Sequence, residues 1–466
     1  MKIAINKICI LCAVLSILSS CGVYKKYQTP EVSTDHLTGD SIPADSITAQ
    51  LPQIQADSIS WRDFFTDPLL QNLIDSALAR NTDMRSAQLT LDKAQASLKA
   101  AKLAYLPSLS LNPQASISTT VGTDGSTSGL SHSYNIPLQL DWNIGISGSV
   151  TVNKRKAQSV KEQAEAQRDA MKANVISTVA QLYYELLLLD RQLEILLSTD
   201  SLWDISLETE RALWENGQAY STAVNQLESS NLSVKMQIIE TKRSIRNIEN
   251  SMCKVLLMTP RPIERGTWDD LQLAPFNFEV SATALLNRPD VRLADRSLAE
   301  AFYNTAAARA AFFPSFSLQG ILGWTNNGGI IADPGALLLQ LLASLTQPIF
   351  AQGKLRAALK IAKYGQEDQL NQYVQTIINA GNQVNECLAD CSVARDKDIL
   401  YQRQLEVLQD AYDGTHTLMN NGKASYLEVL TAQESLLSAQ LDAAENKYNA
   451  AIALISLYIA LGGATK

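Results

Sequence analysis

Residues 175–196 read VISTVAQLYYELLLLDRQLEIL, and the spacing of their apolar side chains limits what this chain can become. The apolar residues alternate steps of four and three, as in the seam of a coiled coil: Val175, Val179, Leu182, Leu186, Leu189, Leu193 and Leu196. From Ser149 to Asn216 the chain contains neither Gly nor Pro, so the pattern predicts one helix of roughly 100 Å. We expect a helix of that length to pack against other long helices.

Most of the remaining chain is also predicted to be helical. Charged residues make up 18% of the 466 residues, and with 21 Gly and 14 Pro the composition is that of an ordered chain. No proline follows Pro348. Three further stretches lack both Gly and Pro: Leu69–Leu106, Gln218–Thr259 and Lys423–Leu461. The predicted fold class is therefore mainly α.

Two segments interrupt the helical pattern, and in both the apolar residues alternate along the chain. The first covers about 108–146 and includes Leu138, Leu140 and Trp142 at every second position. The second covers about 315–347 and repeats the alternation on both sides of a Gly- and Asn-containing stretch. Each segment is predicted to form a β-hairpin, which gives four strands in the chain.

The two halves of the chain are related by an internal duplication. The pair Asn216-Gly217 recurs 205 residues later as Asn421-Gly422. Nine further residues recur at a shift of 207, namely Asp83, Arg85, Ala87, Leu91, Ala94, Pro107, Ser108, Ser110 and Leu111 as Asp290, Arg292, Ala294, Leu298, Ala301, Pro314, Ser315, Ser317 and Leu318. We expect one repeat over 61–258, a connector over 259–280 and a second repeat over 281–463. Each repeat runs helix, hairpin, long helix, turn, helix.

The N-terminus carries an export signal. Two Lys precede the apolar run Ile8–Leu18, which has the length of a secretory signal. It ends in Leu18-Ser-Ser-Cys21, which resembles the lipobox of bacterial lipoproteins, so we expect residues 1–20 to be removed and Cys21 to carry lipid. An ordinary signal peptide is the alternative. Removing residues 1–20 deletes two Lys and no acidic residue, which changes the formal charge from −8 to −10. Residues 21–60 are polar and predicted to be an extended tether.

The composition excludes several classes of function. The acidic balance, 39 Lys plus Arg against 47 Asp plus Glu, argues against a nucleic-acid partner. No run of about 20 apolar residues follows the signal, so a helical membrane protein is excluded. With three His and no recognisable nucleophile or phosphate loop, we expect neither an enzyme nor a metal or cofactor site. Cys387 and Cys391 fall in a predicted coiled-coil seam and are expected to be small buried side chains.

The length of the predicted strands points to a membrane. Each has roughly 9 to 13 residues, which is enough to cross an outer membrane when tilted. Four strands cannot close a barrel and lipid does not tolerate open edges, so several copies would share one barrel. Two copies satisfy this rule as well as three. If the strands formed a small soluble sheet instead, the chain would be a lipid-anchored coiled-coil structural protein without channel activity.

Several further motifs resemble a known family. Trp61-Arg-Asp-Phe-Phe65, Asp67-Pro68-Leu69 and Asn81-Thr-Asp83 look like the opening signature of TolC-like outer membrane factors, the efflux lipoproteins of the OprM and NodT kind. Gln347-Pro-Ile-Phe350 and Tyr426-Leu-Glu-Val-Leu430 agree with this resemblance. It implies a homotrimer with a twelve-stranded β-barrel in the outer membrane and a long helical barrel in the periplasm. The implied partners are a periplasmic adaptor (membrane fusion protein), an inner-membrane pump of RND type and outer-membrane lipid. The implied function is the passive exit of drugs or other small toxic solutes.

The resemblance also suggests which residues line the pore. In this family acidic side chains ring the periplasmic end at two positions three residues apart. The first position here is Glu428, whereas the second is Thr431, a departure from the family pattern. Glu434 lies three residues further along the same helical face, and the equivalents in the first half are the neutral Gln226 and Ser229. We therefore expect an asymmetric negative aperture, with a solvated helix face as the alternative.

The two Asn-Gly turns are the last predicted site. Asn216-Gly217 and Asn421-Gly422 have the composition of left-handed helix caps. A structural cap explains these residues fully, so contact with an adaptor at the turns is implied by the resemblance alone.

Overall fold

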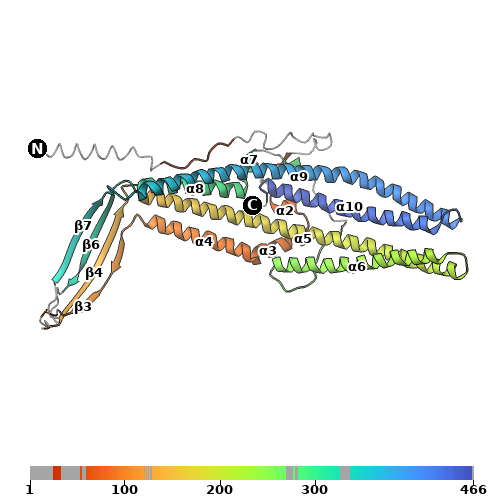
Figure 1. The fold of residues 1–466 in the computed structure, drawn as a ribbon, viewed down its shortest axis with the longest axis horizontal. Helices are drawn as coiled ribbons and strands as arrows, with labels where there is room; N and C mark the ends of the chain where they lie inside the picture. The colour runs from red at the N-terminus through yellow and green to blue at the C-terminus, as the bar shows by residue number, and fades with distance from the viewer. Residues whose placement is uncertain are drawn as a thin grey trace. The chain divides into compact units, whose positions relative to one another are not determined.

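The computed structural model describes residues 25–32, 53–54, 59–119, 121, 123, 125, 129–268, 277–278, 282–325 and 336–463. Figure 1 shows its elements. The helices are α2 (Trp61–Phe64), α3 (Pro68–Arg80), α4 (Thr82–Leu103), α5 (Ser149–Glu215), α6 (Ser221–Val255), α7 (Ala282–Asn287), α8 (Pro289–Ala310), α9 (Lys354–Asn420) and α10 (Tyr426–Ala460). The strands are β1 (Gln53–Ile54), β2 (Ser108–Leu111), β3 (Gln114–Ser118), β4 (Ser131–Ile144), β5 (Asn277–Phe278), β6 (Ser315–Thr325) and β7 (Ala336–Thr346). Within the described part of the chain, no helix combines the length and the apolar character needed to cross a membrane.

The lengths of the helices repeat between the two halves of the chain. Helices α5 and α9 both have 67 residues, α6 and α10 both have 35, and α4 and α8 both have 22. The long helix predicted for 149–216 is α5, which ends one residue earlier. The stretch 69–106 is two helices rather than one, because Asn81 ends α3 and starts α4. Its Oδ1 accepts the backbone N–H groups of Asp83 and Met84 at 2.8 and 3.1 Å.

The contacts divide the chain into two compact units. The first contains the described residues up to Glu31 together with 90–165 and 293–373, and it holds the larger sheet. The second contains the described residues of 32–89, 166–292 and 374–466. A short parallel pair in the second unit joins β1, from the predicted tether, to β5, from the predicted connector, with Gln53 opposite Asn277.

The sheet of the first unit has the order β2-β4-β6-β7, and β3 also pairs with β4. All of its pairings are antiparallel. Strands β6 and β7 are the second predicted hairpin, whereas the first arm of the first hairpin is divided into β2 and β3 by Asn112-Pro113. Proline has no N–H group to donate to a strand ladder. The pairing of β4 with β6 joins the hairpins of the two repeats into one sheet.

The beginning of the predicted tether is packed in the first unit. The hydroxyl of Tyr27 donates to Asp295 Oδ1 at 2.8 Å, and its backbone N–H donates to the hydroxyl of Tyr303 at 3.3 Å. Its ring lies 5.8 Å from that of Phe302, and Arg155 donates to the carbonyl of Lys25 at 3.2 Å. The segment 25–32 has no helix or strand, and Tyr27 packs it against α8.

The second unit is built on the predicted seam. All seven seam residues of α5 are buried or half-buried, and the end of the seam joins a cluster with apolar residues of α6 and α10: Ile195, Leu196, Trp203, Leu207, Val224, Leu227, Val234, Ile238, Leu430 and Leu437. This cluster is the core beneath the two helix turns.

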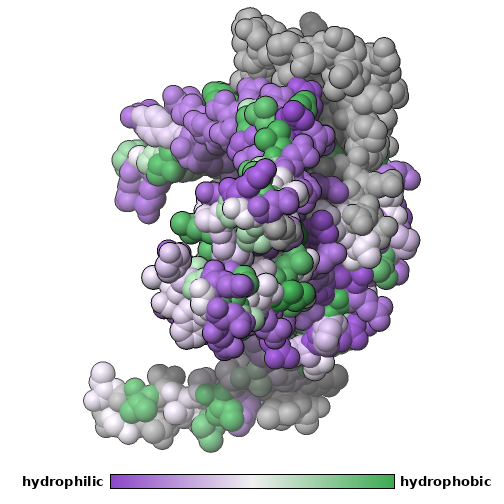
Figure 2. Space-filling model, turned by 90° about the vertical axis from the view of Figure 1, so that its right-hand side faces the viewer, coloured by the Kyte–Doolittle hydropathy of each residue, from purple (hydrophilic) through white to green (hydrophobic). Residues whose placement is uncertain are grey.

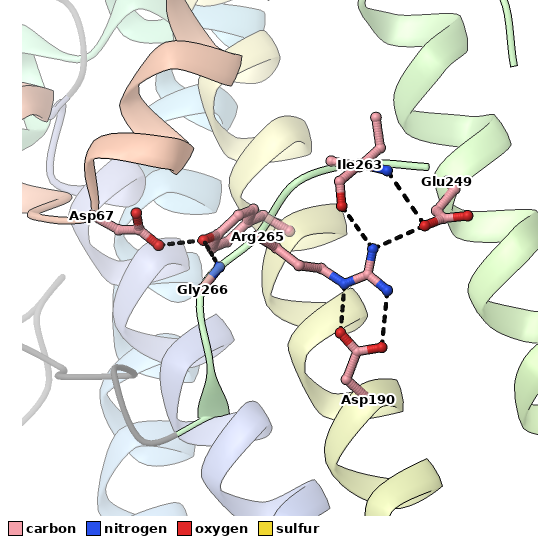
Figure 3. Close-up of polar contacts among 7 residues, drawn as sticks. Asp67, Asp190, Glu249, Ile263, Arg265 and Gly266 are labelled. Carbon is pink, nitrogen blue, oxygen red and sulfur yellow. Dashed lines mark hydrogen bonds and ion pairs between the residues drawn. The ribbon is translucent and has the colours of Figure 1, made fainter. Parts of the chain in front are cut away.

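Polar contacts hold the segment after α6 against the long helices (Figure 3). The guanidinium of Arg265 donates to Asp190 of α5 and to Glu249 of α6, in each case with one contact of 2.9 Å. The hydroxyl of Tyr183 donates to Asp67 and accepts the N–H of Gly266 at 3.0 Å. These contacts bind Arg265-Gly266, which has no helix or strand, to α5 and α6, and through Tyr183 to Asp67, the N-cap of α3.

Candidate functional site

Both predicted turns are left-handed helix caps. Gly217 has a φ of 72° and Gly422 a φ of 68°, a conformation that glycine adopts without steric cost. After α5, Gly217 N–H donates to Trp214 and Gln218 N–H donates to Leu213, at 2.9 and 2.8 Å. The equivalent bonds after α9 are both 2.9 Å. This is the Schellman pattern, which satisfies the last carbonyls of each helix.

The side chains of the two turn asparagines add a further bond each. Asn216 Nδ2 donates to the carbonyl of Ala212 at 2.7 Å, and Asn421 Nδ2 donates to that of Thr417 at 2.8 Å. All four turn residues are exposed. Their side-chain bonds stay within the turns themselves.

The helices that follow the turns begin differently. Glu428 lies in the first turn of α10, where the positive end of the helix dipole favours a negative side chain. The first turn of α6 has no acidic residue. Ser425 and Glu428 have the spacing of a capping box, but the Ser425 side chain makes no cap bond. Glu428 is exposed, so its charge faces solvent in a single chain.

The structure brings Glu434 and α6 together. Ser230 Oγ of α6 donates to Glu434 Oε1 of α10 at 2.8 Å. Ser229 and Glu434 both line an open groove of about 390 Å³ over the buried Trp203. Sequence reasoning selected Ser229 but missed its neighbour Ser230, although the serine pair was visible in the sequence.

The remaining predicted aperture residues are exposed. Gln226 lies on the solvent side of α6, and Thr431 lies on the solvent side of α10. The hydroxyl of Thr431 donates to the carbonyl of Leu427 at 2.9 Å, so it is used within its own helix. The residues predicted for the aperture are therefore all exposed, and among them Glu434 has a described side-chain hydrogen bond that joins α10 to α6.

One buried acid near the turns was missed by the sequence analysis. Glu210 is only 7% exposed, and burial raises the pKa of its carboxyl. The Glu210 charge acts on Tyr426, whose pKa is raised to about 12, mainly by burial. In sequence Glu210 is one of several acids at the end of α5, so nothing marks it as the buried one.

Apolar residues are exposed along the helices of the second unit. On α6 they are Leu232, Met236 and Ile239, spaced by four and three, and on α9 they include Leu400 and Val407, spaced by seven. Figure 2 looks onto the end that carries the turns and shows hydrophobic residues (green) among hydrophilic ones (purple). These spacings are those of coiled-coil seams that the single chain leaves uncovered.

The sheet of the first unit also exposes an apolar face. One row across four strands consists of Leu111, Leu138, Leu322 and Leu339, all of which are exposed. Three residues further along β4, a row that faces the other side of the sheet contains Ser108, Asp141 and Gln319. One face is thus apolar across the whole sheet, and the other carries most of its polar residues.

The described residues contain no group of three or more His, Cys, Asp or Glu arranged to hold a metal ion. Cys387 is buried and Cys391 half-buried, and both are free thiols. Burial raises the pKa of both thiols, to about 12 for Cys391. Cys21 lies outside the described residues.

The comparison with known families identifies the class of protein. The family model described as "Outer membrane efflux protein" matches residues 73–256 and 280–463. The chain belongs to this family, which is a transport family and not an enzyme family. It is an outer-membrane protein, as the sequence resemblance predicts.

Relatives match over nearly the whole chain. The "Probable outer membrane lipoprotein SilC" of Salmonella typhimurium is 28% identical over 96% of each chain. The "Cation efflux system protein CusC" of Escherichia coli K12 is 28% identical over 96% of this chain and 97% of the relative. The "Toluene efflux pump outer membrane protein TtgC" of Pseudomonas putida is 29% identical over 96% and 93%.

Solved structures agree with the fold. The CusC structure has a TM-score of 0.82 at 26% identity and covers 95% of this chain and all of that one. The open state of the MtrE outer membrane channel of Neisseria gonorrhoeae has a TM-score of 0.84 at 27% identity, over 95% and 98%. The TolC-like fold class predicted from the sequence is confirmed.

Proposed function

We propose that this chain is the outer-membrane exit channel of a tripartite efflux system and that it works as a homotrimer. The observation that carries the proposal is the two-faced sheet with an exposed apolar face. In a single chain this face would lie in water, whereas lipid would cover it in an outer membrane. The opposite, more polar face would then line an aqueous lumen.

The open edges of the sheet support a shared barrel. The arm formed by β2 and β3 lies at one edge and β7 at the other. Unpaired edges are not tolerated in lipid, so each edge would pair with another copy. Three copies would give the twelve-stranded barrel of the family, with the alternative of two copies left to the experiment.

The uncovered seams on the helices support the same assembly. Leu232, Met236 and Ile239 of α6 and Leu400 and Val407 of α9 would be buried between neighbouring copies. The long helices would then enclose a periplasmic tunnel. A lone lipid-anchored coiled-coil protein does not account for an apolar sheet face.

The turns and the lipid anchor complete the proposal. The exposed turns Asn216-Gly217 and Asn421-Gly422 would meet the helical tips of a periplasmic adaptor, which links the channel to an inner-membrane pump. Glu428, Glu434 and their neighbours would form the periplasmic aperture. Lipid on Cys21 is supported by the name of SilC as a lipoprotein.

We expect the pump, rather than this chain, to select the transported solute. The names of the relatives mention cations, toluene and antibiotics, although the chains are similar over their whole length. We therefore assign the chain small toxic solutes as a class.

Assembly can be tested by weakening one seam. In isolated outer membranes, chemical crosslinking of the native protein should give a detergent-resistant trimer. Met236→Asp should abolish the trimer because it places a charge in the buried seam, whereas Gln237→Glu, at an exposed polar position of the same helix outside this heptad seam, should retain it. A monomer that carbonate releases from membranes once Cys21→Ala removes the anchor would favour the structural protein instead.

Channel activity can be tested on the purified trimer. In planar lipid bilayers the native protein should give stepwise conductance, and the Met236→Asp variant should give none. A native trimer without any conductance, together with unchanged solute accumulation in a deletion strain, would exclude the exit-channel function.

A further inference from the structure

Asp141 is the one Asp, Glu, Lys or Arg in the sequences of strands β2, β3, β4, β6 and β7. It lies on the more polar face of the sheet, because its neighbours Leu140 and Trp142 belong to the apolar face. A carboxylate in a strand that crosses lipid is tolerated only on a face that water reaches.

The groups that hold Asp141 are neutral. Gln139 Nε2 of the same strand donates to its two oxygens at 3.1 and 2.9 Å. Gln319 Nε2 of β6, which lies directly opposite in the register, donates to Oδ1 at 3.0 Å. Amide donors fix the carboxylate in place and leave its negative charge uncompensated. The position is therefore built to present a charge rather than to form an ion pair with these neighbours.

The register also places Asp141 along the strands. It lies opposite Ser108, the first residue of β2, and opposite Gln319, the fifth residue of β6. Strand β4 ends three residues later, shortly before α5 begins. The carboxylate is thus near the end of the sheet at which the chain passes into the helices.

We propose that Asp141 is a specificity-determining residue of the channel, which favours cations over anions at the base of the β-barrel. This inference rests on the proposed trimeric channel. In that trimer three copies of the carboxylate would lie at one level of the lumen. The barrel wall around them would have a low dielectric constant, which directs their electric field into the lumen. Such a ring raises the local concentration of cations and lowers that of anions. It is separate from the acids near the helix turns, which lie in the second unit.

The test is the permeability ratio of potassium to chloride, measured from the reversal potential of single channels in a KCl gradient. Asp141→Asn keeps the shape and one acceptor oxygen but removes the charge, so the ratio should fall by at least about twofold. Gln319→Glu adds a second carboxylate to the same row, so the ratio should rise. Gln319→Ala, which keeps the charge and removes the amide, should leave a cation preference.

The outcomes separate this inference from the proposed function. If the native protein gives no conductance, the channel itself is excluded and this role with it. If native and Asp141→Asn channels conduct with the same ratio, Asp141 only ties β4 to β6 and the inference is wrong. If Asp141→Asn does not assemble, Gln319→Glu decides, because an unchanged ratio in that variant would overturn the proposal.

Discussion

A single residue shows how the two repeats have diverged at the end of their last helices. Leu257 follows α6 with a φ of 52°, and Gly462 occupies the equivalent place after α10 with a φ of 84°. Both ends have the same cap, in which Met258 N–H donates to Cys253 at 2.9 Å and Gly463 N–H donates to Tyr458 at 3.0 Å. A leucine in this conformation is strained, whereas a glycine is not.

We predict that Leu257→Gly stabilises the protein by about 0.5–1 kcal/mol. The relief of left-handed strain, about 1–2 kcal/mol, exceeds the entropy that glycine adds to the unfolded chain. Little buried surface is lost, because Leu257 is 54% exposed. The thermal midpoint of the trimer in detergent should rise, and Gly462→Ala should lower it. A lower midpoint for Leu257→Gly would show that its side chain has a packing role.

The buried acid Glu210 gives a prediction that depends on pH. Burial raises the pKa of its carboxyl in the folded state, so the folded protein binds this proton more tightly than the unfolded chain. The contribution to stability is therefore complete below the unfolded pKa, near pH 4, and is lost as the pH rises through the folded pKa. Glu210→Gln should raise the thermal midpoint at pH 7.5 and leave it unchanged near pH 4. Glu208→Gln, at an exposed position two residues earlier, should change neither.

At the scale of elements, each repeat has a hydrogen bond between its last helix and the residue just before the helix that precedes its hairpin. These helix pairs are α6 with α4 in the first repeat and α10 with α8 in the second. In the first repeat Asn81 Nδ2 donates to the carbonyl of Val255 at 3.2 Å. In the second, the equivalent residue Arg288 donates to the carbonyl of Ala460 at 2.7 Å. Arg288 is 7% exposed and also donates to Gln383 at 2.7 Å. Both repeats therefore keep this hydrogen bond, but an amide donates it in the first repeat and a guanidinium donates it in the second.

We predict that Arg288→Ala costs about 2–4 kcal/mol, because it leaves buried acceptors without a donor. Asn81→Ala should cost about 1–2 kcal/mol, through one longer bond and the loss of the cap of α4. Thermal midpoints in detergent compare the two variants. Equal losses would mean that the additional contacts of Arg288 contribute nothing to stability.

The sequence predicts those elements whose cause is local. The absence of Gly and Pro and the seam spacing predict α5 to within one residue, and Asn-Gly predicts both turns. Leu257 has no local signal, because leucine does not mark a left-handed cap, and only its alignment with Gly462 through the duplication points to it. The contact of Tyr27 with Asp295 joins residues 268 positions apart, so no periodicity could reveal it. The pairing of Gln319 with Asp141 likewise depends on the register between the two hairpins.

At the scale of the whole molecule, the two acids after the second turn should have different roles. Glu434 accepts a bond from Ser230 within the same chain, at 2.8 Å, so part of its role is to join α6 to α10. Glu428 is exposed in the first turn of α10, three residues after the N-cap residue Ser425. In a trimer, three copies of Glu428 would surround the axis and bind a divalent cation together, which a single carboxylate does only weakly.

We therefore predict that magnesium added on the side of the helix turns reduces the current of the native channel, and that Glu428→Gln weakens this block by about tenfold or more, since three carboxylates are neutralised together. Glu228→Gln is the matched control, because Glu228 lies half-buried on α6 and is paired with Arg211 at 2.8 Å. Magnesium from the opposite side should block less, because it must first pass the barrel. Equal block in native and Glu428→Gln channels would show that Glu428 is a solvated helix residue and that the aperture lies elsewhere. Block that responds to Glu434→Gln instead would place the aperture six residues further along α10, which is nearly two helical turns.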